Sequence, residues 1–459
     1  MENQNQDENY LKSVGAIILS ELNDLKRDSH AAARELGINV NLINGIIAGD
    51  CSLDDVNMLI ARMGEYYPID ASDLYIPKND CFNGIRIMRA GQSEASSRIF
   101  NRKTKDGFET PFYEYRDTAM SKLGPFKPEW IKELRIVGDS NPENPDVAYN
   151  RGHFMHQMTF FIGHVNFYWE DINGKKHSAE MEIGDSNYIT PFHPHSFASR
   201  NKDEDAIIIA VTFGGDVRRA QKELYSLGGE RIERAVFDYR NSNRAAEQLI
   251  RQHMRNEKVS DANLEERIKS MGISDDIVSL LNGSQEISLD NMKILARALN
   301  VELSDLMIPR YKPEEDVVVK KKDSGYLYPD DQNPLYRIHL LAKTSKMPLM
   351  KGYEIEILSK SVDLNNAFES SLHSYIYNYG NEMVNFLWEF EGNQHKEDVN
   401  PGDSLYVQPF IKHAFSNPDL GDAKIIAIGV SGAMNLSTQK ELSYFSSIER
   451  VAHETGRWF

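Results

Sequence analysis

The same set of short motifs occurs twice along the chain, and this duplication limits the possible folds more than any other feature. The recurring pairs are Leu36-Gly-Ile with Met271-Gly-Ile, Asp73-Leu-Tyr-Ile-Pro with Asp305-Leu-Met-Ile-Pro, Val165-Asn-Phe with Val384-Asn-Phe, and Gly184-Asp-Ser with Gly402-Asp-Ser. The spacing within a pair drifts by a few residues, as loop insertions would make it drift. The sequence therefore predicts a tandem duplication of a unit of roughly 230 residues.

Each unit is predicted to have a helical part followed by a strand-rich part. In the first part, apolar residues recur at helical spacing, and Gly37 and Gly49 stand where helices should end. In the second part, short apolar runs alternate with Gly, Asn, Asp and Pro, which is typical of an antiparallel β-sandwich or barrel. The predicted class is α+β, with helix-turn-helix-like domains at 1–77 and 241–309 and β domains at 78–240 and 310–459.

Composition excludes several classes of protein. The longest uninterrupted apolar stretch, about Ala206–Val211, is far shorter than the ~18 residues of a transmembrane helix, so no membrane association is expected. Two cysteines and a polar, acidic N-terminus favour a cytoplasmic protein. The net charge of −17 argues against nucleic acid as the main partner, although a local pocket can still hold a small anion.

Histidines cluster in the first β domain. Asn150-Arg-Gly-His153-Phe-Met-His156-Gln157 opens one segment, and Pro191-Phe-His193-Pro-His195 closes another. Imidazole is a ligand for Fe, Zn, Cu and Ni, and a site with two His and one further ligand leaves positions open for substrate and oxygen. Taken singly, His156, His164 and His193 are better explained as hydrogen-bonded structural residues.

The spacing of His153 and Gln157 sets a condition on the local backbone. In a straight strand, residues four apart lie ~13 Å apart, too far to share one metal ion. At least one of the two must therefore lie on a bend or in a loop. Gly152, directly before His153, makes such a bend feasible.

Gly-His153 followed by Gln157, and Gly184-Asp-Ser followed by Pro194-His195, resemble the two metal-binding motifs of the cupin superfamily. The two-fold combination of a helix-turn-helix with a cupin barrel (a jelly-roll, or double-stranded β-helix) resembles the phosphonate-oxidising iron enzymes, the family of hydroxyethylphosphonate dioxygenase and methylphosphonate synthase. The resemblance covers nearly the whole chain, and its specific motifs lie in the first unit.

The resemblance implies a role for eight residues. His153, Gln157 and His195 would hold Fe(II), with Gln157 in place of the more usual Glu. Asn150 and Tyr115 match phosphonate-binding residues, and Lys26 matches a Lys that reaches into a facing active site. The family's phosphonate-binding Arg falls near Arg102 and Lys105, which both remain candidates.

The resemblance further implies an oxidoreductase of phosphonate biosynthesis that converts 2-hydroxyethylphosphonate and O₂ to methylphosphonate and carbon dioxide, without a separate reductant. The dioxygenase outcome, hydroxymethylphosphonate and formate, is the alternative. It is disfavoured because Ile189 occupies the position of that enzyme's Glu ligand. A site of two His and one Gln carries no ligand charge, so weaker iron retention is expected in the absence of substrate. Whether the chain forms a homo-oligomer is left open.

The second unit lacks this ligand set. Counting back from Val384-Asn-Phe, His153 corresponds to Leu372 and Gln157 to Ile376, with His373 one position out of register. Only His413 is retained, so the second barrel is expected to be structural and without a metal ion.

A small-molecule-sensing transcriptional regulator is the alternative from a different class. Its recognition helix would lie within Asn39–Gly49, which contains no Lys or Arg. Because base and phosphate readout depend on such residues, DNA binding is disfavoured.

Overall fold

The computed structural model describes residues 2–103, 106–361, 363–419, 421–452 and 454–458. It divides into two compact units, which are considered separately. One consists of residues 1–214 and 317–459, and the other of residues 215–316. In the described residues, no helix is both long and apolar enough to cross a membrane.

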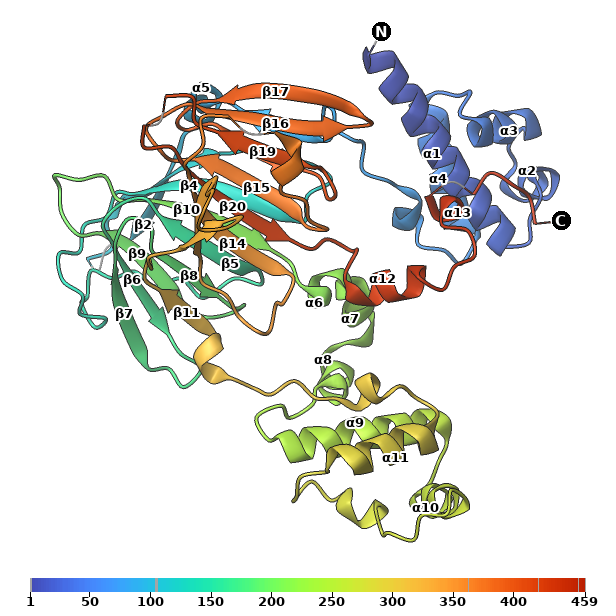
Figure 1. The fold of residues 1–459 in the computed structure, drawn as a ribbon. Helices are drawn as coiled ribbons and strands as arrows, with labels where there is room; N and C mark the ends of the chain where they lie inside the picture. The colour runs from blue at the N-terminus through green and yellow to red at the C-terminus, as the bar shows by residue number, and fades with distance from the viewer. Residues whose placement is uncertain (1, 104–105, 362, 420, 453, 459) are drawn as a thin grey trace. The chain divides into compact units, whose positions relative to one another are not determined.

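Most of the larger unit consists of two similar β-sandwiches, each made of one large and one small antiparallel sheet (Figure 1). In the first sandwich the large sheet has the order β11-β8-β5-β10-β4-β3-β2, and the small sheet has the order β7-β6-β9. Its strands are β2 (Arg98–Lys103), β3 (Glu109–Asp117), β4 (Phe126–Glu133), β5 (His156–Phe161), β6 (Val165–Glu170), β7 (Lys176–Met181), β8 (Ser186–Ile189), β9 (His195–Ser199), β10 (Ile207–Phe213) and β11 (Val317–Lys320).

The second sandwich repeats this arrangement, with a large sheet of order β1-β18-β15-β20-β14-β13-β12 and a small sheet of order β17-β16-β19. Its strands are β1 (Ile85–Met88), β12 (Tyr326–Tyr328), β13 (Tyr336–Leu340), β14 (Met350–Ile357), β15 (His373–Asn378), β16 (Val384–Phe390), β17 (Asn393–Val399), β18 (Ser404–Val407), β19 (His413–Ser416) and β20 (Lys424–Val430). Corresponding strands occupy the same positions in the two strand orders, so the repeated sequence motifs reflect a repeated β-sandwich.

The two sandwiches exchange their edge strands. β1 precedes the first sandwich in the chain but pairs with β18 of the second, where Ile85 lies opposite Val407. β11 begins the second repeat but pairs with β8 of the first, where Val317 lies opposite Ile189. Each large sheet is therefore completed by a strand from the other repeat.

Three apolar cores hold the sandwiches together. Phe161, Phe167 and Phe197 belong to the core between the large and small sheets of the first sandwich, and Phe386 and Phe415 belong to the matching core of the second. A third core is shared by the two large sheets, which pack face to face through buried residues that include Phe160, Tyr188, Tyr375, Tyr406 and Ile428. The alternation of side chains along a strand allows one large sheet to supply two cores.

The N-terminal helices form a small core of their own around Ile18, Ile43, Ile60 and other apolar residues. The elements are α1 (Glu2–Asp24), α2 (Ser29–Leu36), α3 (Val40–Ala48), α4 (Leu53–Tyr66) and the 3₁₀ helix η1 (Ala71–Leu74), and the short α5 (Ala90–Ala95) follows β1. Gly37 and Gly49 end α2 and α3 with φ of 66° and 81°, which confirms the predicted helix ends.

The smaller unit, residues 215–316, is helical and has its own core around Ile250, Leu264 and Leu295. It contains α6 (Asp216–Arg219), α7 (Gln221–Leu227), α8 (Gly229–Ile232), η2 (Glu233–Ala235), α9 (Ser242–Glu257), α10 (Asp261–Ser270), η3 (Val278–Leu280), α11 (Leu289–Leu299), η4 (Leu303–Leu306) and η5 (Pro313–Glu315). It begins before the predicted boundary at 240, because α6–α8 contribute no strand to a sheet. The chain ends with α12 (Leu436–Leu442) and α13 (Glu449–Ala452).

Candidate functional site

The predicted metal ligands come together in the first sandwich. β5 begins at His156, so His153 lies in the preceding loop and Gln157 in the strand, as the spacing required. The loop turns at Gly152, which has φ of 71° and packs so closely that an added Cβ would lie 2.4 Å from the carbonyl carbon of Phe192. The bend brings His153 Nε2 within 3.0 Å of Gln157 Oε1.

Hydrogen bonds to other groups orient the His153 ring and the Gln157 amide so that the lone pair of His153 Nε2 faces Gln157 Oε1. His153 Nδ1 lies 2.8 Å from the carbonyl oxygen of Met155, which can only accept, so Nδ1 carries the proton and Nε2 presents a lone pair. Gln157 Nε2 donates to Thr159 Oγ1 at 2.9 Å, which leaves Gln157 Oε1 facing His153. With a neutral imidazole and this orientation of the amide, two acceptors face each other at 3.0 Å, an arrangement that a cation beside both would stabilise.

His195 is held in the same way at the start of β9. Its Nδ1 donates to the carbonyl oxygen of His193 at 2.8 Å, so its Nε2 also presents a lone pair. Burial lowers the pKa of His195 to about 3, which keeps the imidazole neutral at neutral pH. The rings of His195 and His153 lie edge to face, with centroids 5.2 Å apart.

Asn150 connects these two histidine segments. Its Oδ1 accepts hydrogen bonds from the backbone N–H groups of Gly152 (2.8 Å) and His195 (3.0 Å). Its Nδ2 must therefore be the donor to His195 Nε2, at 2.9 Å. The side chain thus positions both histidine segments and presents an N–H group at a ligand nitrogen.

This donor set fits a divalent iron ion. Two imidazole nitrogens and one amide oxygen are neutral, and imidazole nitrogen is a common iron ligand. Two ligand atoms each about 2.1 Å from one ion at a right angle lie about 3.0 Å apart. The Nε2–Oε1 distance of 3.0 Å between His153 and Gln157 meets this condition. The described residues hold no group of three His, Cys, Asp or Glu side chains suited to a metal ion, so any site here depends on the Gln.

Arg102 and Tyr115 lie on the neighbouring strands β2 and β3. The Arg102 guanidinium lies over the rings of Phe112 and Tyr113, at 4.6 and 5.1 Å, and donates to the carbonyl oxygen of Ala148 at 2.8 Å. Burial, and secondarily Glu133, raises the pKa of the Tyr115 hydroxyl, which therefore remains a donor at neutral pH. Lys105, the other candidate for binding phosphonate, lies outside the described residues.

Lys26 is not brought to these residues by its contacts in the chain. It follows α1 with φ of 59°, and its Nζ lies 4.3 Å from the ring centroid of Trp458. The same nitrogen donates to the carbonyl oxygens of Asn23 and Asp24 at 3.1 and 3.4 Å. Within one chain, Lys26 thus binds the C-terminal segment and the end of its own helix.

Two carboxyl groups on β4 were not identified from the sequence. Glu129 and Glu133 lie on the face of β4 that also carries Ile131, and Trp130 lies on the opposite face. Ile131 belongs to the core of the first sandwich. Burial raises the pKa of Glu129, and raises that of Glu133 well above its ordinary value. Both oxygens of Glu133 lack a hydrogen-bond partner in the described structure. Two Glu residues at period-two spacing in Phe126–Glu133 were the available signal.

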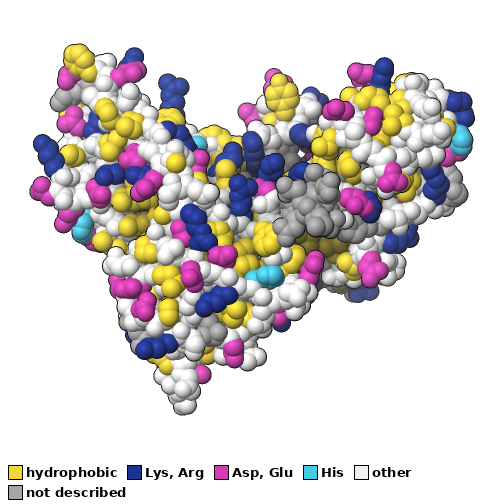
Figure 2. All heavy atoms as spheres, turned by 90° about the horizontal axis from the view of Figure 1, so that it is seen from above, with side chains coloured by type: hydrophobic (Ala, Val, Ile, Leu, Met, Phe, Trp, Pro, Cys, Tyr) yellow, Lys and Arg dark blue, Asp and Glu magenta, His cyan; other side chains and the backbone are white. Residues whose placement is uncertain are grey.

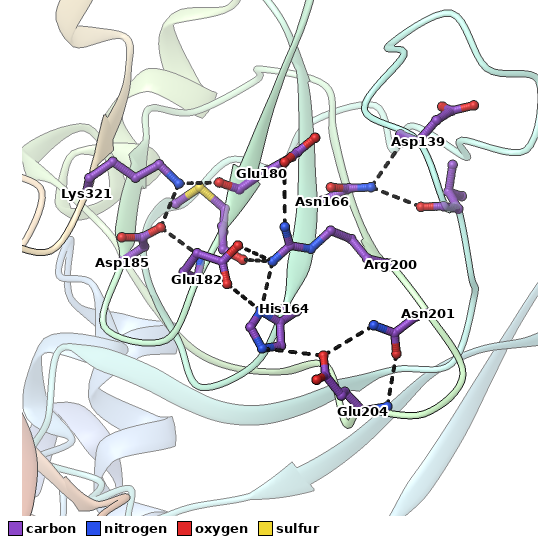
Figure 3. Close-up of polar contacts among 12 residues, drawn as sticks. Asp139, His164, Asn166, Glu180, Glu182, Asp185, Arg200, Asn201, Glu204 and Lys321 are labelled. Atoms are coloured by element: carbon purple, nitrogen blue, oxygen red, sulfur yellow. Dashed lines mark hydrogen bonds and ion pairs between the residues drawn. The ribbon is translucent and has the colours of Figure 1, made fainter.

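His164 is a structural residue, as its sequence context favoured. Figure 3 shows it between Glu182 and Glu204, with Arg200 contacting both His164 and Glu182. Burial raises the pKa of Glu182, but the hydrogen bonds and charges of Arg200 and His164 together outweigh burial and hold the pKa below its ordinary value. The network joins β6, the end of β7 and the end of β9.

The strand pairing of the second sandwich shows that the residues predicted to correspond to His153 and Gln157 were assigned incorrectly. The backbone N–H of Phe192 donates to the carbonyl of His153, and that of Phe410 donates to the carbonyl of Ser370. Gln157 lies opposite Thr212, and Ser374 lies opposite Gly429 at the matching place in the second ladder. His153 and Gln157 therefore correspond to Ser370 and Ser374, and the assignments to Leu372 and Ile376 were wrong. The reference motif, Val384-Asn-Phe, follows a β15–β16 connection of different length.

The same register gives His373 a different counterpart. His156 lies opposite Phe213 in the first sandwich, and His373 lies opposite Val430 in the second. Each of these histidines stacks on a tyrosine of the next strand: His156 Nδ1 lies 2.6 Å from the Tyr188 hydroxyl, and His373 Nδ1 lies 2.7 Å from the Tyr406 hydroxyl. His373 is thus a retained core contact and not a displaced metal ligand.

Known proteins resemble the chain over nearly its whole length, although no family model matches it. Methylphosphonate synthase of Nitrosopumilus maritimus (strain SCM1) is 39% identical over 462 residues, which cover 98% of this chain and 96% of that relative. A solved structure of Streptomyces albus 2-hydroxyethylphosphonate dioxygenase with 2-hydroxyethylphosphonate and Fe(II) bound has a TM-score of 0.89 and 31% identity, and covers 99% of this chain and 100% of that chain.

A further solved structure, of Phpd with cadmium complexed with hydroethylphosphonate, has a TM-score of 0.71 at 14% identity over 97% of this chain and 99% of that chain. At this identity the likeness concerns the fold alone. The order of helical and sandwich segments is therefore shared by proteins whose sequences have diverged widely.

Proposed function

Because the chain belongs to the family of methylphosphonate synthase and 2-hydroxyethylphosphonate dioxygenase, we propose that it is an Fe(II)-dependent oxygenase that cleaves the carbon–carbon bond of 2-hydroxyethylphosphonate. The proposed products are methylphosphonate, carbon dioxide and water. One 2-hydroxyethylphosphonate and one O₂ give one molecule of each product, so the substrate supplies all the electrons and no reductant is needed. We assign the two sandwiches to cupin barrels and the helical segments to helix-turn-helix-like domains, with catalysis in the first barrel.

The observation that carries the proposal is the contact between His153 Nε2 and Gln157 Oε1, where two acceptors meet at 3.0 Å. His153, Gln157 and His195 would hold the ion, which would supply O₂ activation when bound. Opposite Gln157 in the β5–β8 ladder lies Ile189, which is fully buried and has no metal-binding atom. This set favours the methylphosphonate outcome, since the dioxygenase places a Glu ligand at the position of Ile189.

The surrounding residues would bind the phosphonate. A metal ion on His195 Nε2 takes the lone pair to which Asn150 Nδ2 donates, so that N–H becomes available to a phosphonate oxygen. Tyr115 offers a hydroxyl donor and Arg102 a fixed positive charge. The raised pKa values of Glu129 and Glu133 reduce the negative charge that a phosphonate would meet in this core.

Lys26 is proposed to reach the phosphonate of a facing copy of the chain. Its Nζ is held by a ring and two carbonyl oxygens, and a lysine side chain can exchange such contacts for a phosphonate oxygen. Lys105 remains a candidate for the same role beside Arg102.

Phosphorus NMR tests the proposal directly. The protein is loaded anaerobically with Fe(II), mixed with 2-hydroxyethylphosphonate and exposed to air, and methylphosphonate is the expected product. Gln157→Ala should abolish turnover, whereas Gln394→Ala, an exposed strand residue of the second sandwich, is the matched control. Hydroxymethylphosphonate with formate would establish the alternative outcome, and no turnover would exclude both enzyme reactions.

The regulator alternative has little support from the surface. α3, at the place of a recognition helix, contains no Lys or Arg. Figure 2 shows acidic and basic side chains interspersed among the described residues of the face that it draws, rather than one basic field. A gel shift with genomic DNA fragments at low salt should show no retardation.

A further inference from the structure

A cavity of about 440 Å³ lies within the second sandwich, and the catalytic proposal makes no use of it. Its walls include the rings of Tyr328, Tyr353, Phe368 and Phe415, together with His413 and Ser374. The two charged residues of its lining, Lys351 and Glu369, are exposed and opposite in sign. A volume in the ~300–1,000 Å³ range, with apolar and aromatic walls and polar groups from Tyr, Ser and His side chains, is typical of small-molecule sites.

Replacement of the metal ligands accounts for this space. The cavity occupies the place in the second sandwich that corresponds to the candidate iron site in the first, with Ser370 for His153 and Ser374 for Gln157. Gly429 stands where the first sandwich has Thr212, directly opposite Ser374. Large ligand side chains have thus given way to small ones.

His413 corresponds to His195, but no side chain of the described residues donates to its Nε2 as Asn150 does to His195 Nε2. In the first sandwich the backbone N–H of Asn150 donates to the carbonyl of His195, and in the second the backbone N–H of Phe368 donates to the carbonyl of His413. Phe368 therefore replaces Asn150, whose amide donates to His195 Nε2. A phenyl ring offers no such donor.

The remaining contacts of His413 define what it can bind. Its Nδ1 donates to the carbonyl oxygen of Ile411 at 2.9 Å, so its Nε2 presents a lone pair. The side chain is only 8% exposed and lines the cavity, and no donor to Nε2 is found among the described residues. Burial lowers the pKa of His413, so the ring is neutral and acts as an acceptor.

We propose that the second sandwich binds a small uncharged molecule with an aromatic ring and one hydroxyl group, a phenol, whose O–H donates to His413 Nε2 while its ring packs against Phe368 and Phe415. The pairing of a buried acceptor with aromatic walls selects this class. A phosphonate dianion is disfavoured, because the lining has no metal-ligand set and its cation, Lys351, is exposed and accompanied by the opposite charge of Glu369. The inference does not depend on the catalytic activity.

Fluorine NMR of 4-fluorophenol with the full-length protein tests this without iron or oxygen. We expect saturable binding, with fluorobenzene, which lacks the donor, binding about tenfold more weakly; this ratio is about 1.4 kcal/mol. His413→Phe should weaken 4-fluorophenol about tenfold and leave fluorobenzene unchanged. Ser374→Leu should fill the cavity and weaken both at least a hundredfold.

Circular dichroism and the melting temperature establish that each variant is folded. If Ser374→Leu does not fold, Gly429→Val, whose added atoms would approach Leu372, is the second filling variant. Absence of saturable 4-fluorophenol binding, equal affinity for the two probes in the wild-type protein, or undiminished binding by a folded cavity-filling variant would each overturn the proposal.

Discussion

At the scale of single residues, the Gln ligand makes iron affinity the most direct quantity to measure. A neutral amide oxygen is a weaker ligand for Fe(II) than a carboxylate. Gln157→Glu should therefore raise the affinity for Fe(II) without substrate at least tenfold, or about 1.4 kcal/mol. Anaerobic titration measures this, with Gln394→Glu as the charge-matched control. Equal affinity of the Gln157→Glu and wild-type proteins would contradict the assigned ligand role.

The half-buried histidine His373 of the second sandwich predicts a contribution to the pH dependence of stability. Burial lowers the pKa of His373 to about 4, whereas an unfolded histidine titrates near ~6.5. The unfolded state binds more protons between these values, so the free energy of unfolding falls as the pH is lowered through this window. The part of the loss from pH 7 to pH 5 that His373 contributes should be about 1–2 kcal/mol, with the partial exposure of the ring allowed for.

Urea unfolding at pH 7 and pH 5 checks this dependence. His373→Gln should reduce the difference in unfolding free energy between the two pH values by that amount. A difference in the His373→Gln protein as large as in the wild type would contradict the prediction.

How far the sequence predicts single residues depends on the physical signal that each one carries. His153, Gln157 and His195 were expected from the motifs that carry the family resemblance, and Asn150 from the resemblance itself. A stereochemical condition applied to His153 and Gln157, and the structure brings the four residues together. Glu133 was not, because a Glu in an amphipathic strand normally faces solvent. Only the fold shows that it lies in the core.

At the scale of elements, the segment that follows β11 stabilises the second sandwich by an ion pair. Lys322 Nζ lies 2.6 Å from Glu354 Oε1, and the Glu354 side chain is fully buried and also contacts the Tyr379 hydroxyl. Lys322→Met should lower the free energy of unfolding by about 3 kcal/mol, since it leaves a buried carboxylate without its cation. Lys320→Met removes a pair whose carboxylate, Asp323, is exposed, and should change the free energy of unfolding by less than about 1 kcal/mol.

Equilibrium urea unfolding of the two variants compares them directly. An equal loss in both would show that the buried pair contributes no more than the exposed one.

The existence of the repeated strands was easier to predict from the sequence than the residue-by-residue correspondence between the two repeats. Motif matching identified the repeat, but counting from a motif beyond the β15–β16 connection shifted the β15 assignments by two residues. Paired backbone hydrogen bonds, such as those of Phe192 and Phe410, fix the equivalence because they do not depend on loop length.

At the scale of the whole molecule, the exchanged strands predict that neither half folds alone. Residues 1–240 lack β11, and residues 241–459 lack β1, so each fragment leaves a large sheet without an edge strand and one face of that sheet uncovered. Each fragment expressed alone should be aggregated or unfolded by gel filtration and circular dichroism. Co-expression should restore a complex with cooperative thermal unfolding, whereas a soluble, cooperatively unfolding 1–240 fragment would contradict this.

The sequence predicted two copies of a helical part and a β part, but not the exchange. β1 (Ile-Arg-Ile-Met) and β11 (Val-Val-Val-Lys) are both four-residue, mainly apolar strands, so the pattern alone does not assign their partners. Only the long-range pairings Ile85–Val407 and Val317–Ile189 distinguish the two arrangements.

The exchange also governs the order of events during synthesis on the ribosome. β8 of the first sandwich cannot gain its outer neighbour until Val317–Lys320 has left the exit tunnel, after the intervening helical unit has been made. Until then its outer edge has no strand partner, and the large sheet lacks the partner sheet of the second repeat. Such an open edge is a site of intermolecular pairing. Slowing translation of residues 215–316 should therefore increase co-translational aggregation.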